Sequence, residues 1–304
     1  MNDVTPRRMT GTLIERAAAL YDLQPDAFAA RQPYAAAPAF DSGYPGGTPL
    51  RAVAPVKHDR PAAVVDRAAL QERGMIVPGT AVTALAEQFR LVKRQLLQTS
   101  RKVEDADKAR AILVCSARPG DGKTWCAVNL ALSLAAERDV EVLLVDADFA
   151  KPDVLPTLGV VADGGPGLLD ALADPTLDVE TCIADTDVPQ LALLPAGTRM
   201  NGDTELLASD RARAVLHRLV SANPRRIVIF DSPPALAASP AAELAANVGQ
   251  VMLVVRADRT SESDLRESVA LLDGCEHVQL VLNAVAFQPG GPRFGDYYGQ
   301  ESVA

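Results

Sequence analysis

One stretch of the chain, residues 116–124, has the composition of a phosphate-binding loop: Ser-Ala-Arg-Pro-Gly-Asp-Gly-Lys-Thr. An apolar run precedes it and a helical pattern follows, which is the strand, loop and helix order that such a loop requires. Gly120 and Gly122 let backbone N–H groups approach phosphate oxygens, and the helix N-terminus adds positive potential. Lys123 is suited to reach the β- and γ-phosphates of a nucleotide, and Thr124 to hold Mg²⁺.

The loop departs from the usual pattern at its first position, where Ala117 stands in place of glycine. Alanine fits there if the backbone needs no positive φ, because only that region penalises a Cβ atom. A chance glycine-rich turn is the alternative. We expect the nucleotide to contact the whole run, namely Ala117, Arg118, Pro119, Gly120, Asp121, Gly122, Lys123, Thr124 and Trp125.

Two further apolar runs end in aspartate, and both follow the loop in the order found in P-loop ATPases. The first leads to Asp146 and Asp148, and the second to Asp231. A carboxylate at such a position can hold Mg²⁺ or orient an attacking oxygen, whereas a helix cap or turn is the alternative interpretation. We expect Lys123 and the three aspartates to be catalytic, and Thr124, Asp148 and Asp231 to hold the metal.

Elements that position these residues follow from the alternation of patterns along the chain. Short apolar runs at 111–115, 140–145, 191–194, 227–230, 251–255 and 278–282 alternate with helical patterns at 123–137, 203–221, 241–247 and 263–272. This rhythm predicts an α/β fold with a doubly wound, mostly parallel sheet. Ligands of such sheets bind at the carboxyl ends of the strands, where the loop and the aspartates stand.

The chain divides into four segments by composition and periodicity. Residues 1–22 have the spacing of a short amphipathic helix, and 23–80 are rich in Ala and Pro without a sustained period, which predicts a flexible linker. A helical pattern at 82–101 opens the main domain, which we place at 81–287. Residues 288–304 are expected to form a mobile tail.

Composition restricts the class of partner. The 304 residues carry a net charge of −9 and only 4% are aromatic, so an extended nucleic-acid surface is not expected. The four cysteines lie far apart, which favours reduced thiols in a cytoplasmic protein. No apolar run reaches the roughly 20 residues that a membrane-spanning helix needs.

Together, the loop and the aspartate motifs resemble the cytoplasmic ATPase domain of bacterial tyrosine kinases, the BY-kinases of exopolysaccharide synthesis. The resemblance covers roughly residues 82–298. Glu87-Gln-Phe-Arg90-Leu-Val-Lys93 is similar to the oligomerisation helix of that family. Segments 193–197, 204–209 and 281–283 also resemble it, and residues 13–16 resemble the subgroup that accompanies exosortase-linked loci.

This resemblance implies a P-loop NTPase fold, ATP and Mg²⁺ as cofactors, and autophosphorylation of the tail at Tyr297 and Tyr298. It implies that Asn283 lies near the adenine. It also implies a homo-oligomer built through Glu87, Arg90 and Lys93, and a separate inner-membrane co-polymerase, or chain-length determinant, that recruits the kinase. The expected activity is that of a protein-tyrosine autokinase that regulates polysaccharide polymerisation or export.

Some residues depart from the family pattern and keep other functions open. The family often has arginine two residues after the aspartate that corresponds to Asp148, whereas this sequence has Ala150 there, followed by Lys151. The tail contains only two tyrosines. One alternative is a switch ATPase similar to partition or septum-positioning proteins, which carry a lysine early in the loop. Arg118 followed by Pro119 disfavours that class. A nucleotide-binding scaffold without turnover is the third interpretation.

Overall fold

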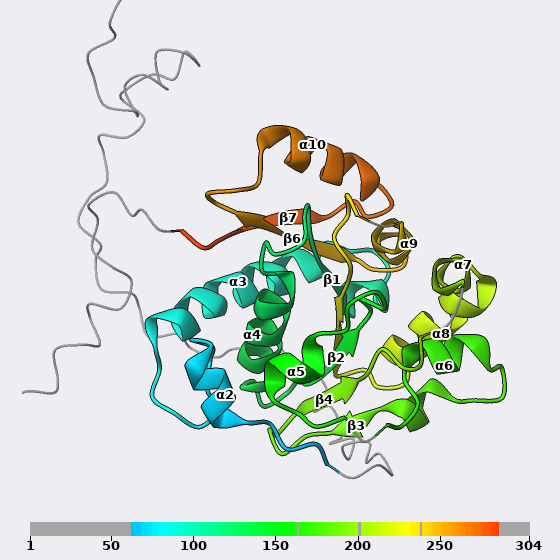
Figure 1. Cartoon of the computed structure of the whole chain (residues 1–304), viewed down its shortest axis with the longest axis horizontal. Coiled ribbons are helices and arrows are strands. Elements are labelled where there is room, and N and C mark those ends of the chain that lie inside the picture. The colour runs from blue at the N-terminus through cyan, green and yellow to red at the C-terminus, as the bar shows by residue number, and fades with distance from the viewer. Residues whose placement is uncertain (1–61, 163, 200–201, 238, 286–304) are drawn as a thin grey trace, which may run out of the picture. The chain divides into compact units, whose positions relative to one another are not determined.

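The computed structural model describes residues 62–162, 164–199, 202–237 and 239–285. Helices and strands alternate through most of this part of the chain (Figure 1). Its elements are, in order, α2 (Arg67–Glu72), α3 (Ala84–Ser100), η2 (Lys108–Arg110), β1 (Ala111–Ser116), α4 (Lys123–Ala135), β2 (Glu141–Asp146), α5 (Val154–Leu158), α6 (Leu168–Ala173), η3 (Val179–Cys182), β3 (Ala184–Asp185), β4 (Leu191–Leu194), α7 (Asp203–Leu207), α8 (Asp210–Ser221), β5 (Arg226–Asp231), α9 (Pro240–Ala245), β6 (Gln250–Arg256), α10 (Glu262–Leu271) and β7 (Val278–Asn283).

Seven strands form one sheet in the order β3-β4-β2-β5-β1-β6-β7. Every neighbouring pair is parallel except β3 with β4, which is antiparallel. All six residues of β1 and of β5 are buried, as expected for central strands covered by helices on both faces. The doubly wound, mostly parallel α/β fold is therefore confirmed.

Hydrophobic side chains pack into two clusters, one on each face of the sheet. One cluster joins the sheet to α2, α3, α4 and α5, and the other joins it to α6, α7, α8 and α9. Ala, Val and Leu supply most of both clusters. Because successive residues of a strand point to opposite faces, Ile112 and Val114 enter the first cluster while Leu113 and Cys115 enter the second.

One helix expected over 203–221 is wrong as a single element, because the structure divides it into α7 and α8. Ser209 separates them. Its hydroxyl donates to the carbonyl of Leu206 at 2.6 Å and accepts from the N–H of Ala212 at 3.1 Å. This serine caps the start of α8, and a residue in a cap conformation cannot continue the preceding helix.

The linker expected over 23–80 is wrong for residues 62–80, which are folded onto the core. Val65 and Leu70 are fully buried there, and Asp66 caps α2 with its carboxylate. Ala63 also forms an isolated parallel bridge with Thr186 beside β3. A few apolar residues suffice to hold so short a segment, although they are too few to create a periodic pattern. The rest of the linker, the expected N-terminal helix at 1–22 and the tail at 288–304 lie outside the described residues.

Candidate active site

The phosphate loop connects the end of β1 to the start of α4. Gly122 is the N-cap of α4 with φ of +96°, and Gly120 has φ of +85°, a conformation that side chains with a Cβ rarely adopt. Ala117 is buried and does not have a positive φ. Alanine at the first loop position is therefore compatible with this backbone, and the glycines stand where the chain needs them.

Side chains from neighbouring elements hold the loop in place. Asp121 is buried and accepts from the backbone N–H of Arg118 at 3.0 Å. The guanidinium of Arg118 makes two hydrogen bonds, 2.9 and 2.8 Å long, to the carboxylate of Asp264 on α10. Asn283, at the end of β7, donates to the carbonyl of Asp121 at 2.9 Å. Asn283, which we expected to lie near the adenine, thus lies beside the loop and supports it.

Three of the predicted catalytic residues meet directly at the carboxyl ends of the central strands. The ammonium of Lys123 lies 2.7 Å from the carboxylate of Asp148 and 3.8 Å from that of Asp231. Thr124 donates its hydroxyl proton to Asp231 at 2.6 Å. Lys123, Thr124, Asp148 and Asp231 therefore form one compact cluster next to the phosphate loop, as the strand ends predicted.

Asp146 lies beside this cluster at the end of β2. It is in register with Asp231 on the adjacent strand β5. One of its oxygens accepts from the N–H of Val154 at 3.0 Å, and the other from the N–H of Asp148 at 3.3 Å. These bonds fix the carboxyl group on the turn that leads from β2 to α5.

Burial governs the ionisation of these groups. It raises the pKa of Asp146 to about 7, helped by the negative charge of Asp231. Burial likewise raises the pKa of Asp231 to about 6, although Lys123 and the Thr124 hydroxyl counteract it. For Lys123 burial acts to lower the pKa, but the charges of Asp231 and Asp148 outweigh it, and the pKa is raised. Lys123 is therefore a cation, and Asp146 can take up a proton near neutral pH.

The donor set of the cluster suits a hard divalent cation. Oδ1 of Asp231 is buried and has no hydrogen-bond partner in the described part of the chain. A hydroxyl and two carboxylates offer the oxygen ligands that Mg²⁺ prefers, with water and phosphate oxygens completing its coordination. The described residues include no cluster of three or more His, Cys, Asp or Glu side chains able to bind a metal by themselves. The residues present thus fit Mg²⁺ shared with a phosphate.

The side chain of Trp125, which we expected to contact the nucleotide, points toward Arg73 and Phe89. Its indole N–H donates to the carbonyl of Arg73 at 3.2 Å, and its ring centroid lies 5.8 Å from that of Phe89 on α3. The side chain thus packs α4 against α3 and the segment after α2. Any contact of this residue with a nucleotide would be made by its backbone.

Of the three charges expected on an oligomerisation surface, only Arg90 is well exposed. Arg90 pairs with Glu87 one turn earlier, and Glu87 itself is buried. Lys93 does not fit this prediction, because its side chain is 7% exposed and its ammonium is bonded within the chain to the carbonyl of Ser133 and to Glu137. Sequence spacing placed Lys93 on a polar face, but α4 covers that position. The predicted acceptors Tyr297 and Tyr298 lie outside the described residues.

Sequence reasoning missed the residues that brace the loop from β6 and α10. Arg256 donates to the carbonyl of Gly120 at 3.0 Å, and Thr260 donates to Asp121 at 3.4 Å. Asp264 holds Arg118 and has a pKa lowered to about 2, chiefly by that guanidinium. Arg256 ends an apolar strand, as Asp146 and Asp231 do, so a search for polar residues at the ends of apolar strands would have found it. Nothing in the spacing indicated Asp264.

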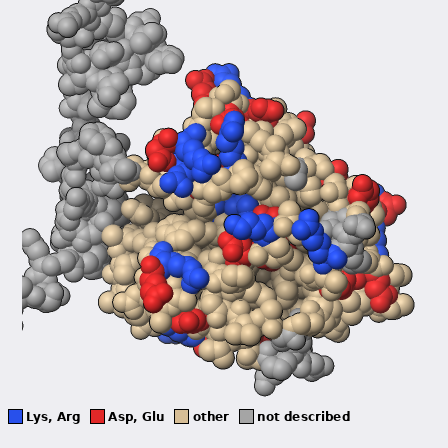
Figure 2. Space-filling model, in the orientation of Figure 1, with Lys and Arg blue, Asp and Glu red and all other residues tan. Residues whose placement is uncertain are grey.

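The face of the molecule drawn in Figure 2 carries acidic and basic side chains close together. Basic side chains gather over the region where β6 and α10 meet in Figure 1, with acidic ones among them. Among the described residues, no helix is both long and apolar enough to cross a lipid bilayer.

Comparisons with known proteins agree with this geometry. A family model described as an AAA domain matches residues 109–276. EpsB of Ralstonia solanacearum is 31% identical over 194 residues, which are 62% of this chain and 25% of EpsB. The chain thus spans about a quarter of the length of that relative. Tyrosine-protein kinase YwqD of Bacillus subtilis is 26% identical over 212 residues, which are 69% of this chain and 85% of YwqD.

Solved structures give the same result. The crystal structure of the VpsO kinase domain is 29% identical to this chain, with a TM-score of 0.52, and the match covers 64% of this chain and 97% of that domain. The family model, the named relatives and the loop with its aspartates therefore all point the same way. This chain belongs to the bacterial tyrosine kinase (BY-kinase) family of P-loop proteins.

Proposed function

We propose that this protein is an ATP-dependent protein-tyrosine kinase that phosphorylates Tyr297 and Tyr298 in its own C-terminal tail. The proposal is based on the cluster of Lys123, Thr124 and Asp231 beside the phosphate loop. A nucleotide phosphate bound to the loop would meet a cation and the oxygen ligands of a metal at the same point.

The loop from Ala117 to Thr124 would hold the phosphates through its N–H groups and the N-terminus of α4. Thr124, Asp148 and Asp231 would hold Mg²⁺, directly or through water. The metal would supply positive charge against the β- and γ-phosphate oxygens. Nucleotide binding requires Lys123 to turn from Asp148, 2.7 Å away, toward the phosphates. The phosphate charge can replace the carboxylate that now neutralises this ammonium.

In the transfer step a tyrosine oxygen attacks the γ-phosphorus of ATP. The new oxygen–phosphorus bond forms as the bond to the bridging oxygen of ADP breaks, and ADP leaves. The phenolic proton passes to Asp146, whose carboxyl group lies in register with Asp231 at the end of β2, beside the cluster. Lys123 stabilises the charge on the transferring group. The remaining contribution is positioning of the two reactants.

We further propose that phosphorylation is regulatory and takes place between copies. In this proposal the kinase oligomerises through the exposed side of α3, where Arg90 pairs with the buried Glu87. It acts in the cytoplasm and joins an inner-membrane co-polymerase that sets polysaccharide length. The proposed organisation remains an N-terminal helix over residues 1–22, a linker that ends before residue 62, the kinase domain, and a tail over 288–304. Each added phosphate brings about −1.5 to −2 charges, which would weaken docking near the aspartates.

A switch ATPase is the second candidate, and Arg118 argues against it. A switch of that class needs a basic side chain early in the loop that reaches into a partner subunit. Arg118 stands at that place, but the Nε and Nη2 groups of its guanidinium both donate within the chain to the carboxylate of Asp264. The bidentate pair fixes the orientation of the side chain. A kinase with a loop braced in this way needs no such crossing contact.

Incubation of the purified protein with ATP and Mg²⁺, followed by phosphotyrosine mapping by mass spectrometry, tests the proposal. We expect phosphate on Tyr297 and Tyr298 in the parent protein and none in Lys123→Met. ATP hydrolysis without phosphotyrosine, even with the cytoplasmic part of the membrane partner added, would favour the switch ATPase. Nucleotide binding without hydrolysis or transfer would favour the scaffold.

A further inference from the structure

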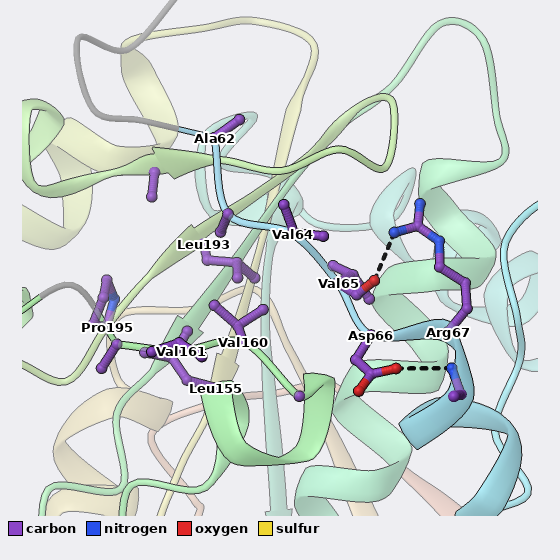
Figure 3. A pocket seen from close by; sticks show the side chains of 15 residues that line it. Ala62, Val64, Val65, Asp66, Arg67, Leu155, Val160, Val161, Leu193 and Pro195 are labelled. Atoms are coloured by element: carbon purple, nitrogen blue, oxygen red, sulfur yellow. Dashed lines mark hydrogen bonds between the residues drawn. The ribbon is translucent and has the colours of Figure 1, made fainter.

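The two ends of the sheet edge that carries the active site differ in their charges. At the end of β4 lies a cavity of about 740 Å³, and Figure 3 shows its largely apolar walls, among them Val160 and Leu193. Arg67 is the one basic residue in the described lining of this cavity, and it is already paired with Asp187. The other end, where β6 meets α10, is the region over which basic side chains gather in Figure 2.

Arg259 lies on the turn between β6 and α10, beside the phosphate loop. A Cβ atom added to Gly120 would lie 3.1 Å from Nη1 of Arg259, so the guanidinium stands directly against the loop backbone. Loops of this kind hold the β- and γ-phosphates of a nucleotide with their backbone N–H groups. The side chain of Arg259 is exposed and can turn toward a phosphate that the loop holds.

The guanidinium of Arg259 makes no hydrogen bond or ion pair with any residue in the described part of the chain. The other cations beside the loop are each bound to a carboxylate: Lys123 to Asp148, Arg118 to Asp264 and Arg256 to Asp258. Arginine stays charged at every physiological pH. An unpaired guanidinium against an anion-binding loop is therefore available for the anion itself.

The backbone that carries Arg259 is fixed to the loop through the residues on both sides of it. The N–H of Arg259 donates to the carbonyl of Arg256 at 3.1 Å, and the guanidinium of Arg256 donates to the carbonyl of Gly120 at 3.0 Å. Thr260 donates its hydroxyl to the buried Asp121 at 3.4 Å. Because the turn is already ordered, binding a phosphate has to order only the side chain of Arg259.

We propose that Arg259 binds the β- and γ-phosphates of ATP and, together with Lys123, stabilises the charge that develops during phosphate transfer. This inference rests on the binding of ATP at the loop that is proposed above. The planar guanidinium can donate two parallel hydrogen bonds to phosphate oxygens. As the tyrosine oxygen bonds to the γ-phosphorus and the bond to the bridging oxygen breaks, negative charge moves onto the ADP that leaves. Arg259 would meet that charge from the side of β6, and Lys123 from the start of α4.

This assignment supplies the second cation from the same chain. The guanidinium of Arg118, at the position where a switch ATPase presents its crossing cation, is held by Asp264. With Arg259 on the phosphates, each copy has a complete set of charges for its own nucleotide. The site then needs no basic residue from another copy.

Equilibrium binding of fluorescent nucleotides to the full-length protein with Mg²⁺ tests the contact without turnover. Arg259→Ala should weaken binding of the non-hydrolysable β,γ-imido analogue of ATP about tenfold and binding of ADP less than about threefold, because only the triphosphate offers the γ-phosphate oxygens. Arg259→Lys should recover part of the loss, since lysine keeps the charge without the planar fork. Arg266→Ala is the matched control, because this exposed arginine of α10 is bonded to Glu262 on the same helix.

Turnover gives a second measurement. At saturating ATP, Arg259→Ala should lower kcat for phosphotyrosine formation at least about hundredfold, because an arginine on the transferring phosphate supplies about 10³–10⁵-fold in other P-loop enzymes. Arg266→Ala should keep the kcat of the parent protein.

Parent affinity of Arg259→Ala for the triphosphate analogue, an equal loss for both nucleotides, or an equal effect of Arg266→Ala would overturn the assignment of Arg259. An unchanged kcat in Arg259→Ala would overturn its role in transfer. Failure of the kinase proposal is distinguishable, because the binding measurement needs no acceptor tyrosine. A parent protein that forms no phosphotyrosine but shows the expected difference between the two nucleotides contradicts the kinase proposal and supports the phosphate contact. A parent protein that binds neither nucleotide contradicts both.

Discussion

Replacing Asp146 by asparagine should change how stability depends on pH, because this carboxyl group is buried with a raised pKa. The side chain is 2% exposed and its pKa is raised from 3.8 to about 7. The folded state therefore binds the proton more tightly than the unfolded state. This contribution is fully present at acid pH and is lost as pH rises from about 4 to about 7.

The expected magnitude follows from that shift. The pKa of Asp146 is raised from 3.8 to about 7, and each unit corresponds to roughly 1.4 kcal/mol. Above pH 7, the charged Asp146 therefore lowers the free energy of unfolding by about 4 kcal/mol. Asparagine stays neutral and avoids this cost. In the parent, the two oxygens of Asp146 accept from the N–H groups of Asp148 and Val154. The oxygen of asparagine can keep one of these bonds, but its NH₂ group faces the other N–H, so one hydrogen bond is lost at a cost of about 1–2 kcal/mol. The variant should gain about 2–3 kcal/mol at pH 8 and nothing near pH 5.

Urea unfolding of the protein without nucleotide or divalent metal measures this difference. Trp125, the one tryptophan in the chain, provides the fluorescence signal. Parent and Asp146→Asn should be equally stable near pH 5 and should diverge by pH 8. Asp139→Asn, at an exposed position, is the control and should follow the parent at every pH. Parallel curves for parent and Asp146→Asn, or a variant less stable at pH 8, would show that the charge on Asp146 does not destabilise the folded protein.

Four further substitutions separate the roles of neighbouring residues. Lys123→Met should abolish ATP turnover while circular dichroism remains unchanged, because it removes the phosphate-binding cation; turnover at the parent rate would contradict the site. Lys93→Met should lower the free energy of unfolding by about 1–2 kcal/mol, because it removes buried bonds that Lys93 makes to α4 and to Glu137. Arg90→Ala should leave this free energy unchanged and alter only the mass distribution in light scattering. Asp264→Asn should weaken ATP binding severalfold by releasing Arg118, and calorimetry showing parent affinity would exclude that bracing role.

Most of the sheet was predictable because its strands are short, continuous apolar runs. The expected strand at 191–194 has the bounds of β4, and the others differ by one or two residues. The two-residue strand β3 and the helices α2, α5 and α6 were missed because five or six residues contain too little periodicity to be recognised. Their stability comes from packing: Leu168 and Leu172 of α6, for example, are buried in the core.

The cluster around Lys123 was predictable for a topological reason, since parallel strands bring their carboxyl ends to one edge. What the sequence could not predict is how side chains from distant elements turn. Lys93 turns toward α4 and Trp125 toward Phe89, because the α3–α4 interface offers a carbonyl and an aromatic ring there. The Arg118–Asp264 pair joins residues 146 positions apart, and only the folded sheet brings them together.

Phosphate transfer to the tail of another copy can be measured by mixing two variants of the protein. The donor carries Tyr297→Phe and Tyr298→Phe and retains the active site, while the acceptor carries Lys123→Met and retains both tyrosines. After incubation with ATP and Mg²⁺, mass spectrometry should find phosphotyrosine on the acceptor at Tyr297 or Tyr298, and only when the donor is present. A donor that hydrolyses ATP and leaves the acceptor unmodified would show that phosphate is not transferred between copies.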